Sequence, residues 1–511
     1  MGGKTLTQLT YVLQAVIIAT VILTVCIYVP SFKRKIRLRS LPVLSSLSGE
    51  RQRRAYLKSA RRMYQYGYAK FKNSVYRITQ EEGVENVVVP ASLLPELRNL
   101  QDDVLSFPIA FKTLNETKYT KLNLELPAGI HAIKTNLTQS LTRLSPIISS
   151  EVDAAMRQYM PSCENWSEVN INKILLYVVS QVSGRIFVGP ELCRNPEYIE
   201  LVTNYTVYLG ATVAAVKQLR PWLKPFLAHR LPEVVQLRKY QQRLSEFVLP
   251  IINERMTAKA KDPNWQEPDD MLQWIIARSS GKEGDGKASI EDIASFQITL
   301  IFGAIHTTTL TATNILYTLA VTPEYICPIR EEMRNVIAEN GGIVTSRALQ
   351  QMGKLDSYMR EVNRFYAPGI TAFSRRALKG ITLSNGQYIP PGVTIEVPSA
   401  AIHLDDEYFP SGDVFDGFRS YKLCASGKEA VIARNQFVTS NETNLAFGYG
   451  RHVCPGRFFA ANEIKMILVK LILEYDVKMP NGETERYAQI DVGPASIPDT
   501  EKTLAFKKVE I

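Results

Sequence analysis

The chain has 511 residues, enough for one large domain or three smaller ones, and its 45% hydrophobic and 22% charged residues exclude a disordered or collagen-like protein. The net charge of +10 arises in residues 33–72, which hold 13 Lys and Arg against one acid, so the remaining body does not suit nucleic acid. The six cysteines are scattered without a CxxC pair, which excludes a disulfide scaffold and a zinc finger.

The first predicted element is an apolar helix. Residues 11–29 carry no charge, and this stretch is long enough to cross the hydrocarbon core of a bilayer. A basic run follows at residues 33–39 while only Lys4 precedes it, so the positive-inside rule places the N-terminus in the lumen. A cleaved signal peptide is the alternative, although its apolar region would be shorter and its basic flank would come first. We therefore expect a single-pass anchor at residues 1–30, a basic and proline-containing linker at 31–50, and a cytosolic body at 51–511.

The body is expected to be mainly helical, with a small sheet and no internal linker. Residues 279–289 are rich in glycine and charge and predict a loop. Asn385-Gly386, between two β-rich runs in residues 381–397, predicts a hairpin. Four segments carry apolar residues at the three- and four-residue spacing of helices: 233–256, 290–320, 349–366 and 458–475.

The most informative stretch is residues 447–457, which read FGYGRHVCPGR. It delivers Cys454 just before a predicted helix, whose N-terminal partial charge and free N–H groups favour a thiolate. Gly448, Gly450 and Gly456 let the backbone fold tightly around the sulfur. Such a thiolate suits a nucleophile, a zinc ligand or an iron ligand, and the plain alternative is a buried cysteine in a tight loop.

At Phe447, Gly450, Cys454 and Gly456 this stretch resembles the cysteine loop of the cytochromes P450, the haem-thiolate monooxygenases. The resemblance implies a mainly α fold, the family's helical prism with small β-sheets, in addition to the N-terminal transmembrane helix. It also implies that Cys454 is the axial ligand of haem b iron. His452 departs from the family pattern, because it stands where an arginine usually contacts a haem propionate. A histidine can still donate a hydrogen bond there, but its charge depends on pH.

A second match is Glu361-Val-Asn-Arg364, which resembles the family's ExxR motif. Glu361 and Arg364 stand at i and i+3 on a predicted helix, so they can pair on one face. Such a spacing alone usually gives a solvated pair of little consequence. Arg419 matches the third partner of the motif. The resemblance implies a structural Glu–Arg–Arg cluster that locks the loop carrying Cys454.

A third match is the run GAIHTT at residues 303–308, similar to the family's oxygen-activating segment. Thr307 fits the threonine that manages protons, while Ala304 and His306 replace the usual glycine and acid. His306 is therefore a candidate relay, or else an ordinary core or surface histidine. The threonines could equally do no more than bond to helix carbonyls.

Three basic residues extend the predicted haem site. Arg375 stands where the family places a propionate-binding arginine, and a bidentate contact to a carboxylate favours it. His131 and Lys134 resemble the family's propionate-contacting helix, although solvated basic residues are the ordinary case. With these three, the predicted cofactor-binding set also holds Phe447, Gly450, His452, Cys454 and Gly456.

The three matches occur in family order and imply a monooxygenase that inserts one oxygen atom of dioxygen into an apolar substrate. No flavin or nicotinamide motif accompanies them, so electrons are expected from a separate NADPH-dependent reductase. The spellings CPGRFFAANEIK, IHTTT and FDGFRS look most like fungal members of secondary metabolism, mycotoxin pathways included. Among these the chain is similar to terpenoid oxidases such as ent-kaurene oxidase and the indole-diterpene oxidases. We expect a monomer on the cytosolic face of the endoplasmic reticulum.

Two other functions are alternatives to this one. A haem-thiolate isomerase or dehydratase would need no reductase, and Thr307 argues mildly against it. A membrane-tethered interaction protein without cofactor would make the cysteine loop a coincidence, which three motifs in order argue against. Residues 221–226, which read PWLKPF, either dip into lipid as part of an access channel or form an ordinary surface turn.

Overall fold

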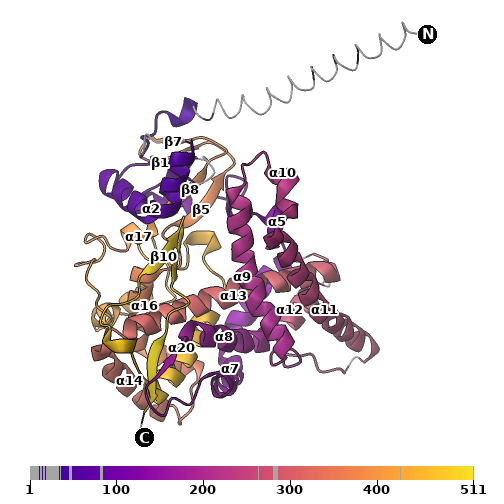
Figure 1. Ribbon diagram of the computed structural model, residues 1–511, viewed down its shortest axis with the longest axis vertical. Coiled ribbons are helices and arrows are strands. Elements are labelled where there is room, and N and C mark those ends of the chain that lie inside the picture. Colours follow the sequence, from indigo (N-terminus) through magenta and orange to yellow (C-terminus); the bar gives the residue numbers. More distant parts are fainter. Residues whose placement is uncertain are drawn as a thin grey trace.

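The structure is a computed structural model, shown in Figure 1. The predicted anchor at 1–30 lies almost wholly outside the residues it describes, as does most of the predicted loop at 279–289. The described residues are 36–44, 49–80, 85–262, 264–279, 286–425 and 427–509, with residues 11, 14, 18 and 34.

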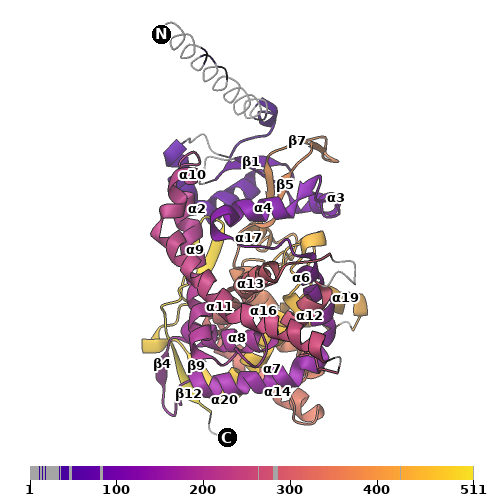
Figure 2. The same cartoon turned by 90° about the vertical axis from the view of Figure 1, so that its right-hand side faces the viewer.

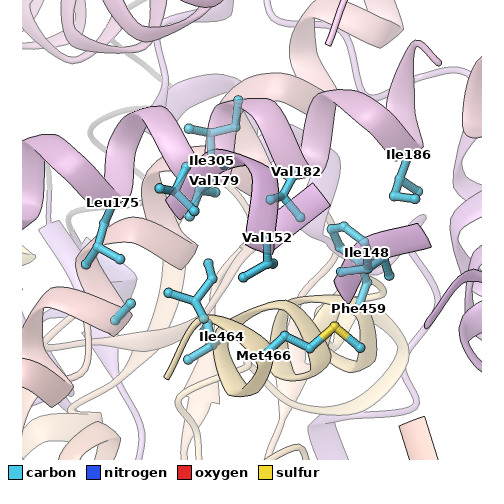
Figure 3. Close-up of a cluster of buried hydrophobic side chains, with 14 of the residues drawn as sticks. Ile148, Val152, Leu175, Val179, Val182, Ile186, Ile305, Phe459, Ile464 and Met466 are labelled. Atoms are coloured by element: carbon cyan, nitrogen blue, oxygen red, sulfur yellow. The ribbon is translucent and has the colours of Figure 1, made fainter. Parts of the chain in front are cut away.

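Four helices contribute to the largest hydrophobic core: α7 (Thr138–Tyr159), α8 (Ile171–Phe187), α13 (Ile290–Leu319) and α20 (Arg457–Glu474). Each carries apolar residues three and four positions apart, so each buries one face or more against its neighbours. Figure 3 shows the side chains of this cluster interleaving between the helices. Its labelled members are Ile148, Val152, Leu175, Val179, Val182, Ile186, Ile305, Phe459, Ile464 and Met466.

A second group of helices covers one side of this core. α9 (Pro196–Gln218) packs against α11 (Pro232–Lys261), and the short α10 (Lys224–Leu227) lies in their connection. Among the described residues, α9 and α13 are long and apolar enough to cross a membrane. Both are packed into the body, α9 against α11 and α13 against α8, so neither corresponds to the predicted anchor.

The main sheet has five strands in the order β1-β2-β8-β5-β3. They are β1 (Tyr76–Thr79), β2 (Glu85–Val88), β8 (Thr394–Val397), β5 (Ala372–Ala377) and β3 (Leu105–Ser106). Only β2 and β8 run parallel, with Val87 opposite Ile395. A separate core beneath this sheet contains Leu38 and Leu41, so part of the stretch expected to be a linker is packed into the body.

The predicted hairpin is confirmed over half of its length. β6 (Ile381–Thr382) pairs antiparallel with β7 (Tyr388–Ile389), and Gly386 between them has φ of +80°, which glycine adopts without steric cost. The rest of the run, Thr394–Val397, instead joins the five-stranded sheet, because β2 offers it a parallel partner.

The helix predicted over 349–366 is divided in two, α15 (Ser346–Gln351) and α16 (Gly353–Tyr366). The physical reason is the Glu332 carboxylate, which accepts hydrogen bonds from the N–H groups of Lys354 at 2.7 Å and Leu355 at 3.0 Å. These are free N–H groups of a first helical turn, so Glu332 caps a new helix start.

The remaining elements surround these cores, and Figure 2 shows α4, α6 and α12 on the right-hand side of the view in Figure 1. The helices are α2 (Gly49–Lys70), α3 (Leu94–Leu97), α4 (Phe107–Leu114), α5 (Thr117–Thr120), α6 (Pro127–Ala132), α12 (Met271–Arg278), α14 (Ile326–Glu339), α17 (Ser399–Ile402), α18 (Arg419–Cys424) and α19 (Glu429–Arg434). The strands are β4 (Ser167–Val169), β9 (Tyr475–Lys478), β10 (Gln489–Val492), β11 (Ala495–Pro498) and β12 (Leu504–Lys508).

Candidate active site

A cavity of about 530 Å³ lies between α13 and the start of α20. The connection from α16 to β5 and the residues that follow α6 complete its walls. Most of its lining is apolar, including Phe187, Phe296, Leu300, Ala304 and Phe459. Its chemistry therefore suits a large apolar ligand held by few polar contacts.

Cys454 lies in the wall of this cavity, in a loop that its glycines make possible. Gly448 and Gly450 have φ of +77° and +76°. A Cβ on Gly450 would stand 2.8 Å from the Cβ and carbonyl oxygen of Arg98, so no larger residue fits. The Cys454 N–H donates to the Phe447 carbonyl at 2.8 Å, which closes the loop.

The protonation of the Cys454 thiol differs from the sequence expectation. Burial raises its pKa, while the N–H groups of Gly456 and Arg457 at the start of α20 and the Arg457 charge act in the opposite direction. Burial outweighs them, so the helix terminus alone does not yield the thiolate that was expected. A metal ion would supply the missing stabilisation, because a coordinating thiol is deprotonated outright. Among the described residues no cluster of three His, Cys, Asp or Glu could hold such an ion, which argues against zinc.

The shape of the cavity fits a haem. Gly303 in α13 and Gly456 before α20 both line it. A Cβ built on either glycine would meet no atom within 4 Å, so both backbones face open space. A glycine inside a helix destabilises it by about 1 kcal/mol relative to alanine, which makes Gly303 costly unless a group must approach α13 closely. A flat macrocycle between the two walls satisfies this condition.

Polar residues gather at the edge of the cavity beside Phe107. His452 lines the cavity, stacks on Phe107 with centroids 4.9 Å apart, and places Nε2 2.8 Å from Asp102 Oδ1. Burial lowers the pKa of His452, against a smaller rise from Asp102. Arg375 is 5% exposed and packs over Phe107 and Phe373, and burial lowers its pKa to about 10. Arg375 itself does not belong to the cavity lining, but Phe107 and Phe373, on which it packs, do. The His452 ring can therefore meet a carboxylate of a bound group at this edge, with the Arg375 charge close by.

The two residues predicted after α6 are placed differently. Lys134 lines the cavity. His131 lies outside the lining, and its Nδ1 is 3.1 Å from Arg278 Nη1 in α12. Of this pair, the structure brings only Lys134 to the site.

The two candidates on α13 also differ. Thr307 lines the cavity, and its hydroxyl donates to the Gly303 carbonyl at 2.8 Å, so the threonine both faces the cavity and bonds to its own helix. His306 lies outside the lining, and burial lowers its pKa to about 4, against a smaller rise from the Thr206 backbone in α9. The structure therefore turns His306 towards α9 rather than into the cavity.

Glu361, Arg364 and Arg419 form the cluster that the spacing predicts. Arg364 is bidentate on Glu361, with Nε at 2.9 Å and Nη2 at 2.7 Å, and Arg419 Nε lies 3.2 Å from the same carboxylate. Glu361 and Arg364 are 3% and 4% exposed. Their other hydrogen bonds reach the chain between His403 and Asp416, as in the bond from Asp416 N to Glu361 at 3.0 Å. The cluster therefore clamps the segment that precedes the cysteine loop.

Two polar residues that bond to lining residues but do not themselves line the cavity were missed by sequence reasoning. Asp102 pairs with His452 across 350 positions of the chain. His403 joins Arg364 to Leu445 at the start of the cysteine loop. Neither stands in a local pattern, so the sequence offered no signal for either residue.

The thiol is buried and faces an apolar cavity, and the two walls of the cavity leave room for a flat macrocycle. These features place the protein in the class of haem-thiolate proteins. Comparison with known proteins makes the family specific, since the family model for cytochrome P450 matches residues 131–500. Cytochrome P450 monooxygenase TES1 of Alternaria alternata is 38% identical over 501 residues, or 97% of this chain and 94% of its own length. The ent-kaurene oxidase P450-4 of Gibberella fujikuroi is 32% identical over 449 residues, or 86% of each protein.

The fold has a solved counterpart in the retinoic acid bound cyanobacterial CYP120A1. Its TM-score is 0.69 at 17% identity, over 92% of this chain and 99% of that one. The chain belongs to the cytochrome P450 family. It is an oxidoreductase whose cofactor is haem with a cysteine thiolate on iron. Monooxygenases of this family generally need a redox partner, and eukaryotic members are typically bound to the endoplasmic reticulum membrane.

Proposed function

We propose that this protein is a membrane-anchored monooxygenase of fungal secondary metabolism that oxidises a terpenoid, taking electrons from a separate NADPH-dependent reductase. The observation that carries the proposal is the mainly apolar cavity between α13 and Cys454. A hydrocarbon skeleton gains free energy when such a lining removes it from water. The similarity to ent-kaurene oxidase P450-4 supports the terpenoid class.

Cys454 is the residue we assign to iron. Its backbone N–H is held by Phe447, and the N–H groups of Gly456 and Arg457 face its sulfur. When bound, the haem supplies the activation of dioxygen and the transfer of an oxygen atom to carbon. The loop supplies a fixed thiolate position and excludes water from it.

We assign the carboxylates of the cofactor to Arg375, His452 and Lys134. Arg375 and His452 both pack against the Phe107 ring, and Lys134 lines the cavity. Arg375 is kept because it packs on Phe107 and Phe373, which line the cavity. His131 and His306 are left out of the functional set because neither lines the cavity and their contacts are with α12 and α9. Phe447, Gly450 and Gly456 remain in it as residues that shape the cysteine loop.

Thr307 is the residue we assign to proton handling. Its hydroxyl hydrogen is committed to the Gly303 carbonyl at 2.8 Å. The lone pairs of Oγ1 therefore remain available to accept a hydrogen bond from a water or ligand in the cavity. A residue in this state can hold a water molecule in place at the reacting side of the cavity.

The membrane assignment has support besides the predicted anchor at residues 1–30. Trp222 and Phe226 are 64% and 66% exposed, at the connection between α9 and α11. In Figures 1 and 2, α10 lies at the same end of the molecule as β1 and β7, opposite the C-terminus. Exposed aromatic side chains at one end suit the membrane interface. We propose single-pass attachment to the endoplasmic reticulum with residues 51–511 in the cytosol.

The test is expression in a reductase-supplied host that is fed a panel of terpenoid hydrocarbons, with fatty acids and alkyl aromatics as the comparison. We expect terpenoid products that contain one or more added oxygen atoms, and none with Cys454→Ser. Oxidation restricted to the comparison compounds would refute the terpenoid assignment. Product formation that persists without any reductase would refute the electron route.

A further inference from the structure

We infer that His403 is a positioning residue, which fixes the start of the cysteine loop by accepting a hydrogen bond from the Leu445 backbone. His403 follows α17 and is 0% exposed. The inference rests on the proposed role of Cys454 and adds to it a residue that touches neither cofactor nor substrate.

On one side, His403 is tied to the Glu361 cluster. Arg364 Nη1 donates to the His403 carbonyl at 2.5 Å, and His403 Nδ1 lies 3.2 Å from the Arg364 carbonyl oxygen. A carbonyl oxygen can only accept, so the ring proton is on Nδ1. The His403 N–H also donates to the Ser399 carbonyl at 2.8 Å. Main chain and ring together therefore fix the direction in which Nε2 points.

On the other side, Nε2 meets the cysteine loop. The Leu445 N–H donates to it at 3.1 Å. This requires a ring nitrogen without a proton, as the assignment of the proton to Nδ1 provides. Burial, with the nearby charge of Arg364, lowers the pKa of His403 to about 3, so the ring is neutral under physiological conditions. Both nitrogens are thus used in a single tautomer.

Two backbone hydrogen bonds connect the segment that contains Leu445 to Cys454. The Leu445 carbonyl accepts from the Gly448 N–H at 2.8 Å, and the Phe447 carbonyl accepts from the Cys454 N–H at the same distance. Leu445 and Phe447 both line the cavity. Without Nε2 the Leu445 N–H would be a buried donor with no acceptor, which costs free energy unless the loop moves. A moved loop would carry Cys454 with it.

Two amide variants separate hydrogen bonding from the filling of space. His403→Gln places an amide group near Nε2, where its oxygen can accept from Leu445. His403→Asn reaches only the position of Nδ1 and leaves Leu445 without an acceptor. His229→Gln is the matched control, because His229 is an exposed histidine in the turn at Ala228–Arg230.

The experiment compares the full-length haem-loaded proteins. It measures haem per chain and the share of the reduced carbon monoxide complex that has the red-shifted Soret band of thiolate ligation. We expect His403→Asn to lose most of that band, while His403→Gln and His229→Gln keep the wild-type share. If both His403 variants keep the wild-type share of the red-shifted band, or both lose that share equally, the acceptor role of Nε2 is refuted.

The same experiment distinguishes this inference from the proposed function. If the wild-type protein has haem but no shifted band, the assignment of Cys454 fails before any variant is compared. Should His403→Asn fail to fold, amide hydrogen exchange at Leu445 decides the matter. Protection in the wild type and in His403→Gln supports the inference, and rapid exchange in the wild type overturns it.

Discussion

The two walls of the cavity are built from different interactions. The Cys454 wall is held by buried charged and polar groups that pair over long stretches of chain, as Glu361 does with Arg419 and His403 with Leu445. The α13 wall combines apolar side chains such as Phe296 and Leu300 with threonines, and the Thr307 hydroxyl bonds to a carbonyl of its own helix rather than to a distant part of the chain. Buried charges must meet their partners, so they specify one geometry, whereas apolar contacts are non-directional. One wall therefore fixes the reaction centre, and the other is the wall to which we assign the substrate.

The largest effect on the protein is expected from removing a buried charge that supports the Cys454 wall. Glu361→Ala leaves Arg364 and Arg419 without their shared carboxylate, at a cost of about 3–5 kcal/mol for a broken buried pair. We expect protein without haem, as measured by the ratio of Soret to protein absorbance. Glu246→Ala is the control, since that carboxylate forms an exposed ion pair with Arg243. A fully haem-loaded Glu361→Ala protein would contradict the claim that the cluster holds the segment before the cysteine loop in place.

The next effect lies on the α13 wall. Thr307→Ala removes the hydroxyl that faces the cavity without touching the cysteine loop. We expect unchanged haem content, product formation reduced by about 10²-fold, and electrons released as hydrogen peroxide instead. The ratio of product formed to NADPH consumed measures this coupling. Unchanged coupling would show that Thr307 serves only its own helix.

A smaller effect is expected at Glu463, a buried carboxyl of α20 that is only partly paired and so departs from the paired groups of the Cys454 wall. Glu463 in α20 is fully buried, and burial raises its pKa to about 8. The Ser183 hydroxyl, which donates to its carboxylate at 2.8 Å, lowers the pKa by less than burial raises it. Among the described residues its Oε2 atom has no hydrogen-bond partner. The folded protein therefore keeps a proton that the unfolded chain releases, and stability falls as pH rises from the ordinary pKa of 4.5 towards 8.

Glu463→Gln removes this dependence. At pH 6 we expect the variant to be more stable than the wild type by about 2 kcal/mol, the value for one and a half pH units. At pH 4 the two proteins should unfold alike. Denaturant unfolding at both pH values measures the difference, and equal stability at pH 6 would mean that Glu463 is charged in the folded protein.

The smallest effect concerns the surface beyond the α13 wall. In a protein lacking residues 1–30, Trp222→Ser with Phe226→Ser should weaken binding to lipid vesicles by about tenfold, since partial burial of each ring contributes about 0.7 kcal/mol. Vesicle flotation measures the bound fraction. Val492→Ser is the control, because Val492 is 52% exposed in β10, away from this connection. Equal binding of both variants would leave residues 221–226 as a surface turn.

The sequence predicted the Cys454 wall better than its supporting contacts. Glu361 and Arg364 are three positions apart on one helix, and residues 447–457 form a continuous stretch, so local patterns carried both. The bond from His403 to Leu445 spans 42 positions and depends on how two loops meet. A pattern confined to one segment contains no information about such contacts.

The same limit explains the differences elsewhere in the fold. Helical periodicity continued through Met352, yet the Glu332 carboxylate, which lies 22 positions before Lys354, starts a new helix there. His306 stands in the sequence where the family has its proton-handling acid, but the packing of α13 turns it towards α9. In both cases a partner distant in the chain decided the outcome.

The central claim is that Cys454 provides a thiolate ligand to haem iron from a pre-shaped wall. The most direct test is the absorption spectrum of the reduced full-length protein before and after carbon monoxide, for the wild type and for Cys454→Ser. We predict a strongly red-shifted Soret band in the wild type and the loss of this band in Cys454→Ser. An unshifted band in the haem-loaded wild type, or a shifted band that survives in Cys454→Ser, would contradict it.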